Sequence, residues 1–462
     1  MVITSSIAWL LIFFIAIIVL CYKVVELRIA TIILGIGLLI CTIFGNAAGV
    51  ILVIFWVFFV LLLALNIPEI RRNYISTQVL KFYKSVLPKI SQTEQEAIDA
   101  GSVWWDGEIF SGNPDWDILR KNPKPKFSKE EQAFLDGPVN EICEMTNEWK
   151  ASHIDHDLPQ EVWDFVKAKG FFGMIIPKKY GGLEFSPLAV ATVMSKVISR
   201  SGHLNSIIGV PNSLGPAELL LHYGTPEQRN DLLPKLASGE EIPCFALTGP
   251  HAGSDAAAMP DTGIICKGKF EGKEIIGMKL NFSKRYITLA PVATLVGLAF
   301  KLYDPNHLLG EKEDYGITCA LIPSTTKDLE IGRRHLPPGI PFMNGTIIGK
   351  DIFVPLDYII GGTEQAGKGW RMLVECLSAG RAISLPSGAM GGAKTGAWVT
   401  GAYTRAREQF NVPIAEFEGI TEPLGRIAGN TYIITASLNT TAMAIGAGEK
   451  PAVISAIMKY HT

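Results

Sequence analysis

The 462-residue chain is long enough for two to four domains with a large hydrophobic core. Its formal net charge of -2 leaves no basic excess, which argues against a nucleic-acid-binding protein. The seven cysteines are scattered without a CxxC pair, so we expect reduced packing residues in a cytosolic context and no metal site.

The N-terminal part is unusually apolar. Three runs without a charge, at residues 7–20, 29–44 and 50–65, come near the lower limit of the ~20 residues that cross a bilayer. The uncharged start argues against a cleaved signal peptide. Three spans would place the basic loop at Lys23 and Arg28 on the same side as Arg71 and Arg72, the cytoplasmic side by the positive-inside rule. Two spans, with 29–65 as one overlong or re-entrant segment, would place them on opposite sides. We favour three spans.

The residues after the apolar part change pattern twice. Residues 67–127 are predicted to form a connecting arm, ordered because Trp104, Trp105 and Trp116 need burial. Helical patterns then follow at 131–149, 159–169, 187–201, 216–223 and 226–237. From about residue 243, short β-branched runs appear at 264–266, 274–276, 286–288, 294–299 and 316–322. Helical periodicity returns near residue 369.

This order of helices, strands and helices predicts an α+β fold and not alternating βαβ units. We predict N-terminal transmembrane helices at 1–66, the arm at 67–127 and a helical domain at 128–243. A middle β-domain, a barrel or sandwich, follows at 244–365, and an incomplete C-terminal helical bundle at 366–462. The last amphipathic pattern stops without a Gly, Asn or Pro signal, so we expect further sequence beyond Thr462.

The stretch CFALTGPHAGSDAAA, residues 244–258, lies where helices give way to strands. By itself it reads as a strand, a loop and a helix start. It could also form an anion niche, because Gly253 and Ser254 precede small residues whose backbone N–H groups can face a phosphate. The hydroxyls of Thr248 and Ser254 would face the same space. The loop alone does not distinguish these readings.

Several motifs in order resemble the acyl-CoA dehydrogenase family. CFALTGPHAGSD resembles the strand and Thr-Glu-Pro-x-Ala-Gly-Ser-Asp run that open its β-domain, and SKRYITLA (283–290) resembles its flavin-covering segment. VPLDYIIG (354–361) and GKGWRML (367–373) resemble the entry to its C-terminal helices. Residues 158–186 and 222–240 resemble its N-terminal helical domain. With the apolar N-terminus and AIDAGSVWWDGEIF (97–110), the match narrows to the long, membrane-associated members of proteobacterial fatty-acid β-oxidation.

The resemblance implies an FAD enzyme that oxidises fatty acyl-CoA to trans-2-enoyl-CoA, the first step of fatty-acid β-oxidation. In this family a Glu removes the α-proton, and the β-hydrogen leaves as hydride to the flavin. Hydrogen bonds to the thioester carbonyl in a dry site stabilise the developing enolate. The resemblance further implies electron-transfer flavoprotein as acceptor, a homo-oligomer, and a bacterial inner-membrane location with the catalytic part in the cytoplasm.

The resemblance also assigns roles to residues of this chain. Thr248 would bind the flavin pyrimidine edge, Ser254 the FAD pyrophosphate or the nearby CoA arm, and Thr288 the region near N5. Tyr286 stands where the family usually has Trp beside the ring, and Phe245 replaces a common Tyr. The remaining assigned residues are Arg407, Gln409 and Phe410, facing FAD across a subunit interface, and Arg381, near the substrate. An ordinary strand pair at Tyr286 and Thr288, and a solvated helix Arg at 407, are the alternatives.

Departures from the family pattern are informative. Gly249 stands where the family commonly has Glu, and Leu289 where it has Asn. The family's base usually lies beyond the position that matches Thr462; some members carry it just before the residue matching Arg381, where this chain has Gly380. Glu375 is out of helical phase with that position, so we expect the base outside this chain. An acyl-CoA oxidase and a non-catalytic membrane scaffold with a degenerate fold are the alternative functions.

Overall fold

The computed structural model describes residues 2–121, 124, 126–213, 215–337 and 341–462. It divides into two compact units, Met1–Ile90 and Ser91–Thr462. The segment predicted as one arm, 67–127, is therefore shared between the two units, and residues 122, 123 and 125 at its end lie outside the described part. Each unit is described by itself.

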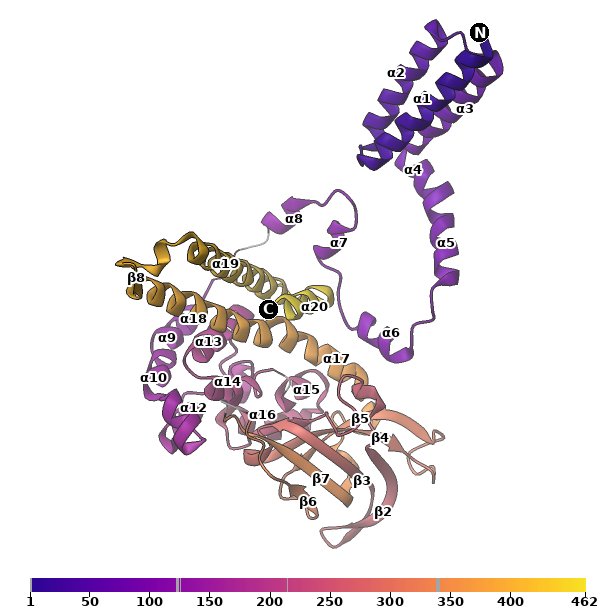
Figure 1. Cartoon of the computed structure of the whole chain (residues 1–462). Coiled ribbons are helices and arrows are strands. Elements are labelled where there is room, and N and C mark those ends of the chain that lie inside the picture. The colour runs from indigo at the N-terminus through magenta and orange to yellow at the C-terminus, as the bar shows by residue number, and fades with distance from the viewer. Residues whose placement is uncertain (1, 122–123, 125, 214, 338–340) are drawn as a thin grey trace. The chain divides into compact units, whose positions relative to one another are not determined.

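Three apolar helices form the first part of the N-terminal unit (Figure 1). Polar bonds tie them at both ends. At one end, Trp9 Nε1 donates to the carbonyl of Gly45 (3.2 Å) and the backbone N–H of Ala48 donates to Ser6 Oγ (2.9 Å). At the other end, Asn66 Nδ2 donates to Thr31 Oγ1 (2.9 Å). The helices of this unit are α1 (Val2–Tyr22), α2 (Leu27–Phe44), α3 (Gly49–Leu65), α4 (Pro68–Ile70) and α5 (Thr77–Val86), with a π-turn at Arg71–Ser76.

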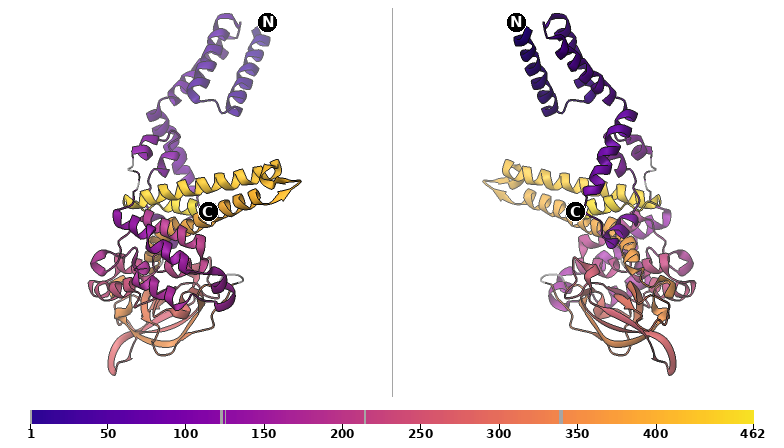
Figure 2. Two further views of the ribbon diagram at one scale, coloured as in Figure 1. Left: turned by 90° about the vertical axis from the view of Figure 1, so that its left-hand side faces the viewer. Right: turned by 90° about the vertical axis from the view of Figure 1, so that its right-hand side faces the viewer.

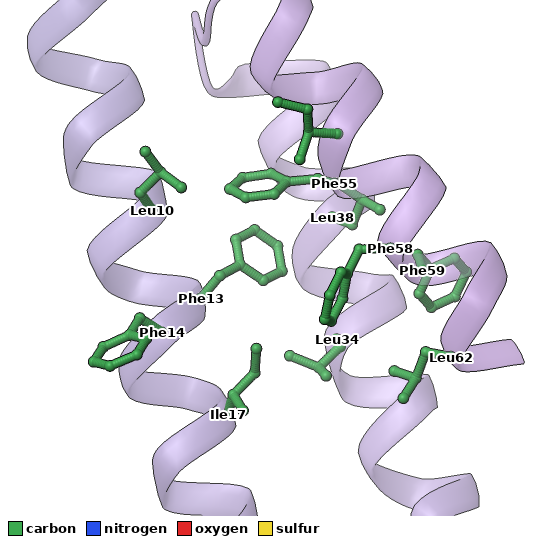
Figure 3. Close-up of a pocket in the computed structure, with 11 residues that line it drawn as sticks. Leu10, Phe13, Phe14, Ile17, Leu34, Leu38, Phe55, Phe58, Phe59 and Leu62 are labelled. Carbon is green, nitrogen blue, oxygen red and sulfur yellow. The ribbon is translucent and has the colours of Figure 1, made fainter. Parts of the chain in front are cut away.

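Two of these helices, α1 and α2, are long and apolar enough to cross a membrane. A third crossing is reached only if α3 and the helix after it, which bends away by 91°, are counted as one span. The sequence-based preference for three spans therefore stays a prediction. A pocket of about 230 Å³ lies between α1, α2 and α3, and Figure 3 shows its apolar side chains pointing toward one another. Its lining is wholly hydrocarbon and suits only apolar groups, which fits a membrane-embedded bundle. It is lined by Leu10, Phe13, Phe14, Ile17, Leu34, Leu38, Ile54, Phe55, Phe58, Phe59 and Leu62.

The second unit begins with the rest of the arm and continues into a helical domain. Ser128 and Glu131 cap each other's backbone N–H groups at the start of α9, as the sequence indicates. The single helix predicted over 131–149 is wrong. Gly137 and Pro138 separate α9 from α10, and the extended residues Thr146 and Asn147 separate α10 from α11. The helices are α6 (Gln92–Asp99), α7 (Asp106–Ile109), α8 (Trp116–Lys121), α9 (Lys129–Asp136), α10 (Pro138–Met145), α11 (Glu148–Lys150), α12 (Gln160–Ala168), α13 (Pro187–Arg200), α14 (Gly202–Gly209), α15 (Pro216–Tyr223) and α16 (Pro226–Ser238).

The middle part is a seven-stranded sheet with path β1-β4-β2-β3-β7-β6, and β5 pairs with β4. Two pairings, β1 with β4 and β2 with β4, are parallel, and the others are antiparallel. The runs at 274–276 and 286–288, predicted as separate strands, are the two ends of one long strand, β3. The strands are β1 (Pro243–Ala246), β2 (Thr262–Phe270), β3 (Lys273–Thr288), β4 (Leu295–Tyr303), β5 (Asp314–Pro323), β6 (Leu329–Ile331) and β7 (Asn344–Pro355).

The C-terminal part returns to helices, so the predicted α+β order of helices, sheet and helices is confirmed. Figures 1 and 2 show α18 and α19 as a long pair joined by a small hairpin. The elements are α17 (Gly369–Ala379), a π-turn (Gly380–Ser384), α18 (Leu385–Ala406), β8 (Glu408–Gln409), β9 (Val412–Pro413), α19 (Glu418–Gly446) and α20 (Ala452–His461).

One long-range contact ties the arm to this C-terminal part. The backbone N–H of Ser102 donates to the carbonyl of Lys450 (2.8 Å). The Ser102 hydroxyl donates to the carboxylate of Glu449 (2.7 Å) and accepts from the backbone N–H of Lys450 (2.9 Å). We call this set of bonds the Ser102 clasp. It fixes the arm against the loop between α19 and α20.

His203, at the start of α14, makes the stability of this unit pH-dependent. Its side chain is fully buried, 3.8 Å from the Asp157 carboxylate, and burial lowers its pKa from 6.5 to about 4. Above pH 6.5 the ring is neutral in folded and unfolded chains alike. As the pH falls from 6.5 to about 4, only the unfolded chain gains the proton, so stability falls by up to about 3 kcal/mol.

We therefore expect the thermal unfolding midpoint of the full chain in detergent to fall between pH 6.5 and 4, and His203→Leu to flatten that fall. His251→Gln, at an exposed histidine, is the matched control and should keep the wild-type pH dependence. An unchanged pH profile in His203→Leu would show that other groups cause the loss of stability.

Candidate active site

The loop after β1 carries the first predicted residues. Phe245 is buried in β1 and its ring packs over Gly297, where an added Cβ would lie 2.5 Å from it. Thr248 is half-buried, and its carbonyl accepts from the backbone N–H of Arg285 (3.1 Å). Ser254 is exposed. The helix start considered after Ser254 is a single 3₁₀ turn at Ala256–Ala258, so an anion site at the N-terminus of an α-helix is not formed there.

A buried ion pair holds this loop against β3. Lys284 Nζ lies 2.6 Å from Asp261 Oδ2 and donates to the carbonyl of Leu247 (3.0 Å). The other carboxylate oxygen of Asp261 accepts from the backbone N–H of Ser283 (2.9 Å). Both side chains are at most 2% exposed. Burial lowers the pKa of Lys284, and the Asp261 carboxylate opposes that shift.

The same packing explains one departure from the family pattern. An added Cβ on Gly249 would lie 3.0 Å from the carbonyl oxygen of Ser283 and 4.0 Å from Asp261 Oδ2. A Glu at this position would therefore be crowded and would set its carboxylate beside Asp261. The chain's geometry here suits glycine.

The end of β3 is irregular where Tyr286 and Thr288 lie. The pairing register with β7 shifts between Lys284 and Ile287, and Tyr286 has φ of +58°. A left-handed backbone at a bulky residue costs on the order of 1–2 kcal/mol. This bulge turns the Tyr286 ring outward, where it is 56% exposed and lies 5.2 Å from the ring of His335. The strand pairing is therefore interrupted at Tyr286, whereas Thr288 pairs with Asn344.

Leu289, the second departure, also has a left-handed backbone, with φ of +68°. Asn adopts that conformation more easily than Leu, which accounts for Asn in the family pattern. Leu289 is fully buried, and its backbone N–H donates to the carbonyl of Met343 (2.7 Å). Burial of its side chain offsets the backbone cost.

Thr288 and Arg381, which are far apart in the sequence, line one cleft of about 360 Å³. The helical domain contributes α13, α14 and the residues after it, the sheet contributes the end of β3, and the C-terminal part contributes the π-turn and α20. The cleft is lined by Met194, Asn205, Ser206, Gly209, Val210, Ser213, Thr288, Phe342, Leu377, Gly380, Arg381, Ser384, Leu385 and Lys459.

The chemistry of this lining is cationic and hydroxyl-rich. Arg381 and Lys459 are its charged side chains, and none of the described lining residues is Asp or Glu. The side-chain oxygen of Asn205 is buried without a hydrogen-bond partner in the described part of the chain. Asn344, which pairs with Thr288 across β3 and β7, also has a buried side-chain oxygen without a partner in the described part of the chain, but it does not line the cleft. An acceptor left unpaired at a cleft is where a bound molecule can donate a hydrogen bond.

Several of these residues carried no signal in the sequence. Asn205, Ser206, Ser213 and Lys459 belong to no motif, and only tertiary packing brings them to the cleft. The π-turn that presents Gly380 and Arg381 had one sequence signal, Pro386, which cannot donate the helical backbone bond.

Glu375 faces elsewhere. Its carboxylate accepts hydrogen bonds from Tyr223 and from Arg371 Nε (3.0 Å), and it lies 3.7 Å from Lys450. Burial pushes its pKa up, but these partners outweigh burial and leave the pKa lowered. A carboxylate held this way is a weak base, and it does not line the cleft of Thr288 and Arg381.

Arg407, Gln409 and Phe410 lie apart from the cleft. They are exposed on the β8–β9 hairpin that joins α18 to α19, and Phe410 has φ of +53° with 89% of its surface exposed. Figure 1 shows β8 at the end of the helix pair away from the sheet. Within one chain these three residues and Thr288 do not form one site, and the predicted contact across a subunit interface stays a prediction.

The helical regions before and after the sheet match two domains of one protein family. Residues 128–240 match the acyl-CoA dehydrogenase N-terminal domain, and residues 367–462 match the acyl-CoA dehydrogenase C-terminal domain. The chain belongs to the acyl-CoA dehydrogenase family.

Individual relatives differ in identity to this chain and in how much of it they cover. The chain is 62% identical to protein HemX of Proteus mirabilis over 104 residues, which are 22% of this chain and 61% of that protein. It is 29% identical to a 3-(aryl)acrylate reductase of Clostridium sporogenes over 337 residues, covering 72% of this chain and 84% of that one. An acyl-CoA dehydrogenase structure from Bacillus anthracis, complexed with FAD, superposes with a TM-score of 0.63 at 23% identity, covering 74% of this chain and 59% of that one.

We expect Lys284→Met to destabilise the protein by about 3–5 kcal/mol, because Asp261 would be left buried and unpaired. The thermal unfolding midpoint measured in detergent would fall accordingly. Lys279→Met, at an exposed lysine of the same strand, is the control and should change little.

The double variant Lys284→Met/Asp261→Asn separates the ion pair from simple loss of packing. It should recover part of the lost stability, because no uncompensated charge stays buried. If the double variant is as unstable as the sum of the single variants, the two side chains do not act as a pair.

Proposed function

We propose that this protein is an FAD-dependent dehydrogenase that introduces the α,β double bond into fatty acyl-CoA thioesters. The proposal extends to a place at the first step of fatty-acid β-oxidation, at the bacterial inner membrane, with electrons passed to electron-transfer flavoprotein. The observation that carries it is that Thr288 and Arg381 line the same cleft, which the helical domain, the sheet and the C-terminal part of the second unit form together. Family membership and the FAD-bound relative support the cofactor.

The residues of the chain fit such a cofactor. Thr248 follows Leu247, whose carbonyl accepts a hydrogen bond from Lys284, and Thr288 ends the strand that carries Lys284. Tyr286 lies between Lys284 and Thr288, and its side chain points away from the strand. Ser254 is exposed on the same loop as Thr248. These four residues would hold the flavin and its pyrophosphate, and the unpaired oxygen of Asn205 would accept a hydrogen bond from a molecule bound in the cleft. FAD, when bound, supplies the two-electron acceptor for the β-hydrogen of the substrate.

Other residues of the cleft would act on the thioester. Arg381 and Lys459 would attract the anionic CoA portion, and the apolar side chains of Met194, Leu377 and Leu385 would exclude water from the acyl chain. Exclusion of water strengthens every hydrogen bond to the carbonyl oxygen as negative charge develops on it. Removal of the α-proton needs a base, and the described cleft lining contains no carboxylate.

The apolar N-terminal helices support the membrane location. Two of them satisfy the length and composition of a span, and the basic residues Arg71 and Arg72 follow the apolar part of the chain.

The direction of the reaction is a separate question, because one relative is named as a 3-(aryl)acrylate reductase. The direction used by this chain is therefore best measured with both an acyl thioester and its enoyl product.

The first prediction concerns the cofactor. The full chain purified in detergent should show a flavin absorption spectrum, and Thr288→Val should weaken FAD binding roughly 2- to 10-fold through loss of one hydrogen bond. Thr262→Val, on the neighbouring strand outside the cleft, is the control and should bind FAD like the wild type. A colourless protein that takes up no FAD would favour the scaffold alternative.

The second prediction concerns the base. The 462-residue chain should show negligible palmitoyl-CoA oxidation with an artificial acceptor, because none of the described residues that line its cleft is a carboxylate. Gly380→Glu places one beside Arg381 and should raise turnover roughly 10²-fold, a typical gain from a positioned general base. Gly380→Gln is the isosteric control without a base and should stay inactive.

Robust turnover by the unmodified chain would show that a group outside the described cleft lining takes the α-proton. Peroxide production in place of acceptor reduction would favour the oxidase alternative. FAD content of both Gly380 variants must match the wild type for the comparison to hold.

A further inference from the structure

The helical segment after α3 does not continue the direction of the apolar bundle. Helix α3 ends at Leu65, and after Asn66 and Ile67 the chain starts a new helical stretch, Pro68–Val86, at 91° to it. This stretch consists of α4, the π-turn Arg71–Ser76 and α5. A helix at right angles to a membrane span lies along the plane of the membrane surface and does not cross it.

The side chains of α5 are divided between two faces. Val79, Phe82, Tyr83 and Val86 follow the i, i+3, i+4, i+7 spacing of one helical face. They are between 48% and 65% exposed, and the main packing partner of α5 is the π-turn before it. Thr77, Lys81, Lys84 and Ser85 occupy the opposite face. Apolar side chains this exposed on one face need an apolar surface to cover them.

The charge of the stretch points to the kind of surface. Residues 68–86 carry four basic side chains, Arg71, Arg72, Lys81 and Lys84, against one acidic side chain, Glu69. Lys23 and Arg28 bracket the short connection between α1 and α2. The bond from Asn66 to Thr31 places the end of α3 next to the start of α2, so the basic stretch 68–86 begins at the same end of the bundle as Lys23 and Arg28.

We propose that residues 68–86 form an interfacial helix that lies on the membrane surface, with its apolar face in the acyl boundary and its basic side chains drawn to anionic phospholipid headgroups. Basic amphipathic helices bind in this way, and tyrosines such as Tyr74 and Tyr83 favour the headgroup level. The occupant of the exposed face is then the bilayer into which α1 and α2 insert. The proposal rests on the membrane attachment of the proposed function.

The test uses the full chain in lipid nanodiscs with a photoreactive benzoylphenylalanine at one position at a time. Phe82 probes the apolar face of α5, Gln78 probes its polar side, and Phe58 of α3 reports membrane insertion. Mass spectrometry counts adducts to lipid and to protein after irradiation. We expect lipid adducts from Phe82 and Phe58 and at least roughly fivefold fewer from Gln78, whose side chain faces water.

The outcomes separate the two levels of the proposal. If Phe58 forms no lipid adducts, membrane attachment fails and the interfacial helix fails with it. If Phe58 forms them and Phe82 forms protein adducts instead, the attachment stands and the helix is a protein-docking element, which overturns the proposal. Equal lipid adducts at Phe82 and Gln78 would indicate a helix immersed in the bilayer as a broken span, which also overturns it.

The headgroup part has its own comparison. In discs with phosphatidylglycerol the lipid adduct yield at Phe82 should exceed that in pure phosphatidylcholine, by roughly up to fivefold per lysine near the surface. Lys81→Gln/Lys84→Gln should reduce this preference, and Gln78→Ala/Ser85→Ala, which leaves the charge unchanged, should keep it. A yield at Phe82 that is independent of phosphatidylglycerol would overturn the recognition of anionic headgroups.

Discussion

The buried ion pair of Lys284 and Asp261 is the constraint on which the cleft depends. It joins the carbonyl after β1, the start of β2 and the irregular end of β3 in one network with no solvent access. Two charges in a dry interior are costly unless each has its partner and its hydrogen bonds. The pair therefore fixes the geometry of its surroundings more strictly than apolar packing would, and both Thr248 and Thr288 lie in chain segments that it holds.

Three parts of the second unit form the cleft together, and none of them supplies all of its polar side chains. A strand end offers Thr288, a π-turn between two helices offers Arg381, and the helical domain closes the remaining side. The residues that lie furthest apart in the sequence, Thr288 and those of α13 and α20, therefore reach the cleft from separate elements, and only the tertiary fold brings them together.

The fold could be predicted from the sequence because local patterns agreed with the tertiary structure. Apolar runs predicted the N-terminal helices, capping residues predicted helix starts, and β-branched runs predicted strands. The family motifs predicted the same order of these elements. The exceptions have physical causes: Gly137 and Pro138 break an expected helix, and the bulge at Tyr286 depends on pairing with β7. At the cleft, Thr288 and Arg381 were found through motifs. Asn205 and Lys459 could not be, because each sits in an ordinary helical pattern and only packing assigns it a place.

The Ser102 clasp has a consequence for the order of folding. Its partners, Glu449 and Lys450, lie more than 340 residues further along the chain. During synthesis, the apolar helices and the arm emerge long before the segment that the arm must grip. Such a contact closes a very long loop and forms late. Until then the hydrogen-bonding groups of Ser102 lack their partners. The nascent chain therefore passes through a stage in which the apolar helices and the arm have been made but the Ser102 clasp has not formed.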